Sequence, residues 1–171
     1  MKGYVQVYTG NGKGKTTAAF GQAIRASGHG KRTYIGQFMK GQVYGEVKVL
    51  RGNRYIDVEQ FGAEKCITKD KITEEHILKS NNGLNRCLEK MKEGYYDIII
   101  LDEINVAIWF GLIKEEKVLE LLDQRPKDIE LILTGRYAPE KIIKRADLVT
   151  EMKCIKHYYD RGVNARNGIE R

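Results

Sequence analysis

The residues best suited to chemistry lie in one glycine-rich stretch, TGNGKGKTT, at positions 9–17. Gly10, Gly12 and Gly14 allow the backbone to bend tightly, so that successive N–H groups can point at phosphate oxygens. A helix beginning at the end of such a loop adds the positive end of its dipole. The stretch therefore predicts a phosphate-binding loop, in which Lys15 bridges phosphates and the Thr16 hydroxyl binds Mg²⁺.

Two residues of this loop differ from the common G-x-x-x-x-G-K-[ST] pattern. Thr9 stands where that pattern has its first glycine, and Lys13 places an additional basic side chain inside the loop. Taken alone, these differences leave open whether the loop serves an ordinary ATPase or another use of ATP.

An acidic pair, Asp102 and Glu103, follows the apolar run DIIIL at 97–101. Acids placed after a buried strand hold Mg²⁺ in nucleotide-binding P-loop proteins, so one or both are expected metal ligands. In a hydrolase Glu103 would instead polarise a water molecule, and a solvated acidic pair is the plain structural alternative. Arg136, in LTGR at 133–136, is a candidate for contacting a phosphate or a leaving group, with a surface arginine in a turn as its alternative.

Strand-like and helix-like runs alternate along the chain, which predicts an α/β fold with a mostly parallel sheet of about six strands and helices on both faces. Ligands bind beyond the carboxyl ends of strands in such sheets, and the polar stretches named above follow strand ends, so they are expected at one edge. The predicted strands cover 3–9, 32–38, 56–61, 96–102, 129–134 and 147–152.

Helices are predicted at 15–28, 72–94, 114–125 and 138–146. The sequence NNG in the second of these favours a kink or a break. The glycine-rich segment 39–53 is expected to form a loop or a hairpin that can move over a ligand. Trp109 and Phe110 are expected in the core.

Bulk composition favours one globular domain covering 1–171, with 42% hydrophobic and 31% charged residues. We expect no membrane segment, since no apolar run approaches the roughly 20 residues that a span needs, and no signal peptide. The three cysteines have no metal-binding spacing, which excludes a zinc site and suits reduced thiols in a cytoplasm. A net charge of +7 suits an anionic partner, but the basic residues are dispersed, so phosphates of a small ligand are favoured over nucleic acid.

The motifs together resemble those of the ATP:corrinoid adenosyltransferases of the CobA/CobO type. The matching runs extend over nearly the whole chain and occur in the family's order: GNGKGKTTAAFG, GHGKR, QFMKG, LDEIN, LTGR and IKHYYDRGVNARNGIE. The family's loop also reads T-G-N-G-K-G-K-T, so Thr9 and Lys13 look like family features. The resemblance implies a P-loop NTPase-like (RecA-like) fold and a homodimer.

The resemblance also implies a reaction in which a cob(I) corrinoid attacks the 5′ carbon of ATP and the whole triphosphate departs. The nucleophile then belongs to the corrinoid, and the protein positions C5′ and stabilises the leaving group with Mg²⁺, Lys15 and loop amides. By this resemblance the run Gly10–Thr16 binds the triphosphate, and Thr16 with Glu103 holds the metal. Asn11, Arg136 and His157 resemble family positions close to the nucleotide.

One stretch departs from the family. Many members have a G-F-T-W segment after the third strand, whose aromatic side chains press on the corrinoid. The corresponding stretch here, FGAEKCITKD at 61–70, lacks that Phe and Trp, and Cys66 and Ile67 are the candidates to fill part of their role. The preferred corrinoid, the reductase that supplies the electron, and a role in biosynthesis or salvage stay open.

Three functions therefore remain to be compared. An adenosyltransferase would release triphosphate in the presence of a reduced corrinoid. A P-loop ATPase or small-molecule kinase would use Asp102, Glu103 and Arg136 for hydrolysis or phosphoryl transfer and release ADP. A non-catalytic nucleotide- or nucleic-acid-binding module is favoured only by the net charge, and would show steeply salt-dependent binding.

Overall fold

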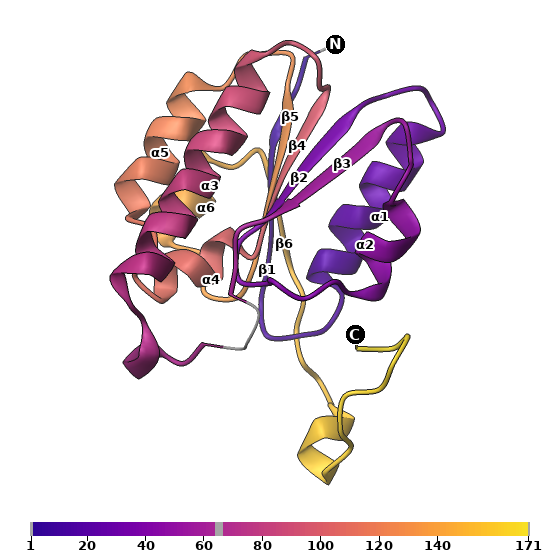
Figure 1. Cartoon of the computed structure of the whole chain (residues 1–171), viewed down its shortest axis with the longest axis vertical. Helices are drawn as coiled ribbons and strands as arrows, with labels where there is room; N and C mark the ends of the chain where they lie inside the picture. The colour runs from indigo at the N-terminus through magenta and orange to yellow at the C-terminus, as the bar shows by residue number, and fades with distance from the viewer. Residues whose placement is uncertain (1, 64–66, 171) are drawn as a thin grey trace.

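A six-stranded parallel sheet forms the centre of the molecule in the computed structural model, which describes residues 2–63 and 67–170 (Figure 1). Neighbouring strands follow the order β3-β2-β4-β5-β1-β6. The strands are β1 (Val5–Thr9), β2 (Thr33–Gln37), β3 (Ile56–Gln60), β4 (Ile98–Asp102), β5 (Glu130–Thr134) and β6 (Leu148–Glu151). The α/β prediction is confirmed, with each strand starting or ending within two residues of its predicted bounds.

Helices cover both faces of this sheet, as Figure 1 shows, with α1 and α2 on one face and α3, α5 and α6 on the other. The helices are α1 (Lys15–Ser27), α2 (Gly45–Leu50), α3 (Glu74–Lys92), α4 (Ile104–Trp109), α5 (Glu115–Gln124) and α6 (Glu140–Arg145), with short 3₁₀ turns at Lys69–Lys71 and Tyr158–Arg161. No helix in the described ranges is both long enough and apolar enough to pass through a bilayer.

Strand β4 explains why the run DIIIL is apolar at consecutive positions. Side chains alternate between the two faces of a strand, and both faces of this strand are covered. Ile98 and Ile100 pack in the cluster that contains α1, whereas Ile99 and Leu101 pack in the cluster that contains α3 and α5. The strand ends at Asp102, which is fully buried, so the apolar sequence delivers a carboxylate to the edge of the sheet.

Of the kink or break predicted in the second long helix, the break is wrong, because α3 runs continuously from Glu74 to Lys92. Gly83 allows a close approach instead: a Cβ at this position would lie 2.4 Å from Cγ of Phe61. Asn81 also supports the helix, since its side-chain amide donates to the carbonyl of Ile77 at 2.7 Å and to that of Leu112 at 2.9 Å. The NNG sequence thus fits helix packing and does not interrupt the helix.

Two further expectations need correction. The segment 39–53 was expected to be a loop or hairpin, but it contains α2, because Val47 and Leu50 bury one side of a helical turn. Trp109 was expected in the core, but it is 43% exposed and stacks on Tyr137 with ring centroids 4.5 Å apart. Phe110 is partly buried against the core, as expected.

Candidate active site

The glycine-rich loop predicted to bind phosphate connects β1 to α1 and contacts the chain that follows β6. Gly10 and Gly14 have φ angles of +93° and +115°, which favour glycine. A Cβ on Gly10 or Gly12 would lie 2.5 or 2.7 Å from the carbonyl oxygen of Met152. The Gly12 N–H donates to that same oxygen at 2.6 Å. Backbone conformation therefore requires glycine at positions 10 and 14, and the neighbouring segment requires it at positions 10 and 12.

Thr9 explains the missing first glycine of the loop. It is the last residue of β1, has no positive φ, and is buried. Its hydroxyl accepts a hydrogen bond from the N–H of Ala138 at 3.3 Å, and its carbonyl accepts one from the N–H of Met152 at 2.8 Å. The threonine hydroxyl therefore ties the loop to the chain after β5. A glycine would keep only the backbone hydrogen bond to the chain after β6.

Lys15 and Thr16 occupy the first turn of α1, next to the positive end of the helix dipole. The Lys15 ammonium folds back and donates to the carbonyl of Gly12 at 2.6 Å. Burial is the largest influence on Lys15 and lowers its pKa, and the nearby charges of Arg136 and Lys40 act in the same direction. An anion entering the loop would relieve this unfavourable charge, as expected of a phosphate ligand.

The Asp102 carboxylate lies behind Thr16 and is fully saturated by protein donors. Oδ1 accepts from the hydroxyls of Thr16 at 2.8 Å and Thr134 at 2.7 Å. Oδ2 accepts from the amide of Gln37 at 2.9 Å and from the ammonium of Lys40 at 3.2 Å. These partners come from α1 and from the chain of β2 and β5, because β4 lies between β2 and β5 in the sheet.

Glu103 differs sharply from its neighbour Asp102. It has a left-handed backbone with φ of 63°, and its N–H donates to the Thr134 hydroxyl at 2.9 Å. This conformation directs the chain away from β4 and places Glu103 in the lining of a cavity at the loop. Burial and the Asp102 charge raise the pKa of Glu103, although the cations of Lys40, Lys15 and Arg136 oppose this shift. A cation beside Glu103 would stabilise its charged form.

Lys40 is a site residue that the sequence reasoning did not select. Its ammonium donates to the Thr16 hydroxyl at 3.1 Å as well as to Asp102. Burial lowers its pKa, but the carboxylates of Asp102 and Glu103 outweigh this, so the pKa of Lys40 lies above its ordinary value. The available signal was its place in QFMKG directly after β2, since strand ends at this edge carry the polar residues.

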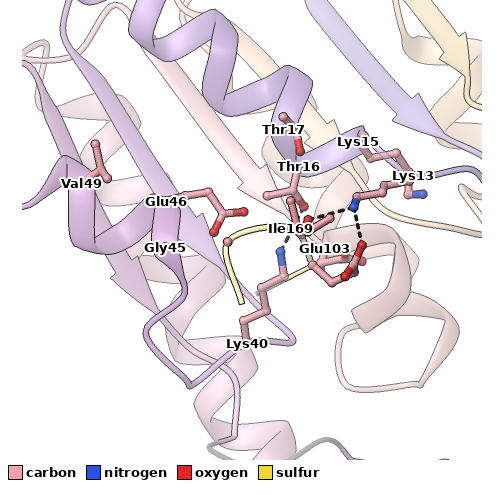
Figure 2. Close-up of a pocket in the computed structure, with 13 residues that line it drawn as sticks. Lys13, Lys15, Thr16, Thr17, Lys40, Gly45, Glu46, Val49, Glu103 and Ile169 are labelled. Atoms are coloured by element: carbon pink, nitrogen blue, oxygen red, sulfur yellow. Dashed lines mark hydrogen bonds and ion pairs between the residues drawn. The ribbon is translucent and has the colours of Figure 1, made fainter. Parts of the chain in front are cut away.

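A cavity of about 540 Å³ opens in front of these groups (Figure 2). Its walls come from the phosphate-binding loop, from α2, and from the C-terminal residues Gly168–Glu170. Figure 2 shows that Lys40 approaches from one side and Lys13 from the other. The cavity mixes both signs of charge, and its charged lining residues are Lys13, Lys15, Lys40, Glu46, Glu103 and Glu170.

The C-terminal tail closes one side of this cavity through Lys13. The Lys13 ammonium pairs with the Glu170 carboxylate at 2.8 Å and donates to the carbonyl of Ile169 at 2.8 Å and the hydroxyl of Tyr158 at 3.0 Å. Glu170 also accepts from Tyr158 and from Arg166. The extra lysine of the loop therefore anchors a segment more than 140 residues away in the sequence.

Not every predicted site residue lies at the cavity. Among the described residues that line it are Lys13, Gly14, Lys15, Thr16 and Glu103, whereas Asn11, Arg136 and His157 are not included. Arg136 is exposed, but its charge affects the pKa of both Lys15 and Glu103, so it lies within electrostatic range. His157 begins the turn of the tail, where its Nδ1 accepts from the N–H of Tyr159 at 3.1 Å.

The oxygen atoms at the cavity suit a hard cation such as Mg²⁺. The Thr16 hydroxyl and the Glu103 carboxylate both line the cavity, and phosphate oxygens would complete their coordination. Asp102 lies behind Thr16, with its oxygens already occupied by protein donors. The candidate ligands are therefore Thr16 and Glu103, with Asp102 orienting Thr16. Cys66, considered above for corrinoid contact, lies outside the described residues.

Sequence comparisons with known proteins indicate one family for this chain. Residues 1–171 match the family described as ATP:corrinoid adenosyltransferase BtuR/CobO/CobP. The chain is 34% identical to a corrinoid adenosyltransferase of Escherichia coli K12 and 35% identical to one of Salmonella typhimurium, each time over 99% of this chain and 86% of the other. A solved KaiC-like protein of Pyrococcus horikoshii shares the fold, with a TM-score of 0.56 and 15% identity over 88% of this chain and 72% of that one.

Proposed function

Since the chain belongs to the ATP:corrinoid adenosyltransferase family, we propose that it transfers the 5′-deoxyadenosyl group of Mg-ATP to the cobalt of a cob(I) corrinoid and releases triphosphate. The observation that carries the proposal is the convergence of Lys15, Lys40 and the first turn of α1 on one cavity. A cavity lined by two ammonium groups and the start of a helix suits a highly charged leaving group.

The proposed step exchanges one bond for another. The electron pair of cobalt(I) forms a bond to C5′ while the C5′–O bond breaks, and that bonding pair stays on the triphosphate oxygen. Cobalt is formally oxidised from Co(I) to Co(III), and no protein nucleophile or proton transfer is required. The chain's own contribution is to orient C5′ and to stabilise the new negative charge on the leaving group.

Particular residues supply this stabilisation. The loop amides and Lys15 would bind phosphate oxygens, and Thr16 with Glu103 would hold Mg²⁺. When bound, Mg²⁺ supplies positive charge to the phosphate oxygens of the leaving group. Arg136 would add long-range positive charge, in keeping with its influence on the pKa of Lys15 and Glu103. The tail Gly168–Glu170 would limit the access of water to ATP, which disfavours hydrolysis.

A hydrolytic or kinase function is the second candidate, and Glu103 favours it. A carboxylate at the cavity with a raised pKa could polarise a water molecule or an alcohol. The two reactions leave different products, because attack at phosphorus gives ADP whereas attack at C5′ gives triphosphate.

The deciding experiment incubates the protein with Mg-ATP and chemically reduced cobalamin or cobinamide. We expect triphosphate and a light-sensitive alkylcorrinoid in equal amounts. ADP without an alkylcorrinoid would reject the proposal and favour the second candidate. Lys15→Ala should remove most ATP affinity or turnover, whereas Lys48→Ala, an exposed lysine on α2, should leave both unchanged.

The proposal extends to the setting of the enzyme. We further propose a homodimer and a reductase that generates the cob(I) acceptor, from the family resemblance, and a cytoplasmic location, from the cysteine pattern. A role in biosynthesis or in salvage stays open. Sedimentation of the purified protein tests the dimer, and the corrinoid assay repeated with cobinamide and cobalamin tests acceptor preference.

A further inference from the structure

We propose that Lys40 is a ligand of the triphosphate that, in the nucleotide-free protein, occupies the position of the metal ion. The inference rests on the proposed function and adds to it a catalytic residue and an exchange of cations. Mg²⁺ entering with the nucleotide would displace the Lys40 ammonium from Thr16 and Asp102, and the released ammonium would bind the phosphate oxygens.

The hydrogen bonds of Thr16 are the first argument. Its hydroxyl proton is directed to Asp102 Oδ1 at 2.8 Å, and its oxygen accepts from the Lys40 ammonium at 3.1 Å. A metal ion binds a hydroxyl through a lone pair of the oxygen, on the side away from the proton. The Lys40 ammonium occupies one of the two lone pairs on that side. Mg²⁺ on Thr16 would therefore share a single oxygen atom with an ammonium ion, which their like charges disfavour.

Charge gives the second argument. The Lys40 ammonium lies 3.2 Å from Asp102 Oδ2, and only 22% of its side chain is exposed. Asp102 is fully buried, so its negative charge needs a neighbouring cation in each state of the protein. Lys40 fills this need before nucleotide binds, and a divalent ion near Thr16 fills it afterwards. Two cations beside the same hydroxyl oxygen would repel each other strongly in this poorly solvated site.

The backbone around Lys40 indicates which part of the residue can move. A Cβ on Gly62 would lie 2.2 Å from the backbone nitrogen of Lys40, so the two segments touch closely and hold the backbone in place. The side chain, with its four methylene groups, lines the cavity opposite Lys13 (Figure 2). Rotation of that side chain moves the ammonium from Asp102 into the cavity without moving the strand end.

The exchange has a consequence for binding. A triphosphate that arrives with Mg²⁺ releases the Lys40 ammonium, which then binds the triphosphate. Metal and triphosphate should therefore bind cooperatively. The nucleotide-free protein should bind a divalent cation poorly, because the ammonium competes for the same oxygens. A lysine that served only as the structural partner of Asp102 would also compete with the metal, but its removal would not weaken triphosphate binding.

The test uses Lys40→Met, which removes the charge and keeps most of the side chain, with Lys48→Met on α2 as the matched control. Mn²⁺ binding to nucleotide-free protein is measured by electron paramagnetic resonance. Binding of inorganic tripolyphosphate with Mg²⁺ is measured by calorimetry. We expect Lys40→Met to bind Mn²⁺ about tenfold more tightly and tripolyphosphate about ten- to a hundredfold more weakly, with Lys48→Met unchanged in both.

Opposite changes in these two affinities support the exchange. A loss of both affinities, or no change in either, would overturn it. Because Lys40→Met leaves Asp102 without its cation, the variant should also be stabilised more by Mn²⁺ than the wild type in a thermal melt, and an equal stabilisation would contradict the proposal. Lys40→Gln provides the same readouts if the methionine variant does not fold.

These binding measurements use neither corrinoid nor turnover, so they separate the two proposals. If the product assay yields ADP while the Mn²⁺ and tripolyphosphate affinities change in opposite directions, the adenosyl transfer is wrong and the cation exchange stands. If triphosphate is released but the two affinities do not change in this way, the exchange is wrong and the proposed reaction stands.

Discussion

The two consecutive acids at the end of β4 offer a sharp test, because the structure places them in opposite environments. Asp102 is fully buried and accepts hydrogen bonds from Thr16, Gln37, Lys40 and Thr134. We therefore consider Asp102→Asn and Glu103→Gln as a matched pair, since each replaces a carboxylate by an amide of nearly the same shape.

Asp102→Asn should lower the free energy of unfolding by about 2–4 kcal/mol. Hydrogen bonds to a charged acceptor contribute about 1 kcal/mol more than those to a neutral one, and Asp102 accepts four. The Lys40 ammonium also loses its partner, while relief of the buried charge offsets part of the loss. The Gln37 amide is held in place by Gln60 at 2.9 Å and cannot easily reverse to accommodate an asparagine.

Glu103→Gln should change the free energy of unfolding in the opposite direction, toward higher stability. Because the folded pKa of Glu103 is raised, the folded protein disfavours its charged form relative to the unfolded chain. The resulting cost appears as the pH rises through the unfolded glutamate pKa of about 4.3 and is complete above the folded pKa. At pH about 8, Glu103→Gln should therefore match or exceed the wild type in stability, and below pH about 4 the difference should vanish. Its turnover should nevertheless fall at least about tenfold, since the proposed metal ligand is lost.

Urea denaturation of nucleotide-free protein, without divalent cations, measures both effects. A loss of about 3 kcal/mol also corresponds to a melting temperature lower by about 6–12 °C in a chain of this size. The reasoning would be refuted if Asp102→Asn were within about 0.5 kcal/mol of the wild type, or if Glu103→Gln were destabilised as much as Asp102→Asn.

Three further predictions concern other parts of the chain. Gly83→Ala, which would normally favour a helix by about 1 kcal/mol, should instead destabilise by about 1–3 kcal/mol because its Cβ meets Phe61; a raised melting temperature would contradict this packing. Cys154 is exposed and should react readily with a thiol reagent, whereas Cys87, whose burial raises its thiol pKa, should react only after unfolding, as peptide mass mapping would show. Glu170→Gln should increase hydrogen exchange across 157–170 and leave β1 unchanged, because its ion pairs hold the tail; unchanged exchange in the tail would disprove that anchoring role.

Much of the fold could be predicted from the sequence, because its signals are local. An apolar run such as 97–101 forms a buried strand wherever it is covered on both faces, and GKT after a strand requires a turn followed by a helix. The break predicted at NNG failed because the sequence does not reveal that Phe61 packs on Gly83. Trp109 was misplaced for a related reason, since an aromatic residue near the end of a short helix can face either solvent or core.

The candidate site also has features that the sequence predicts and features that only the fold decides. Local spacing alone was enough to predict a glycine-rich turn between β1 and α1 and two acids at the end of β4, because glycine conformation and strand ends are properties of short segments. Only the tertiary structure placed Lys40 on Asp102, 62 residues away, and Glu170 on Lys13, 157 residues away. Those contacts depend on the strand order, which sets β2 beside β4, and on the path of the tail back across the loop. Long-range electrostatic partners are chosen by this geometry, and no local pattern in the chain specifies it.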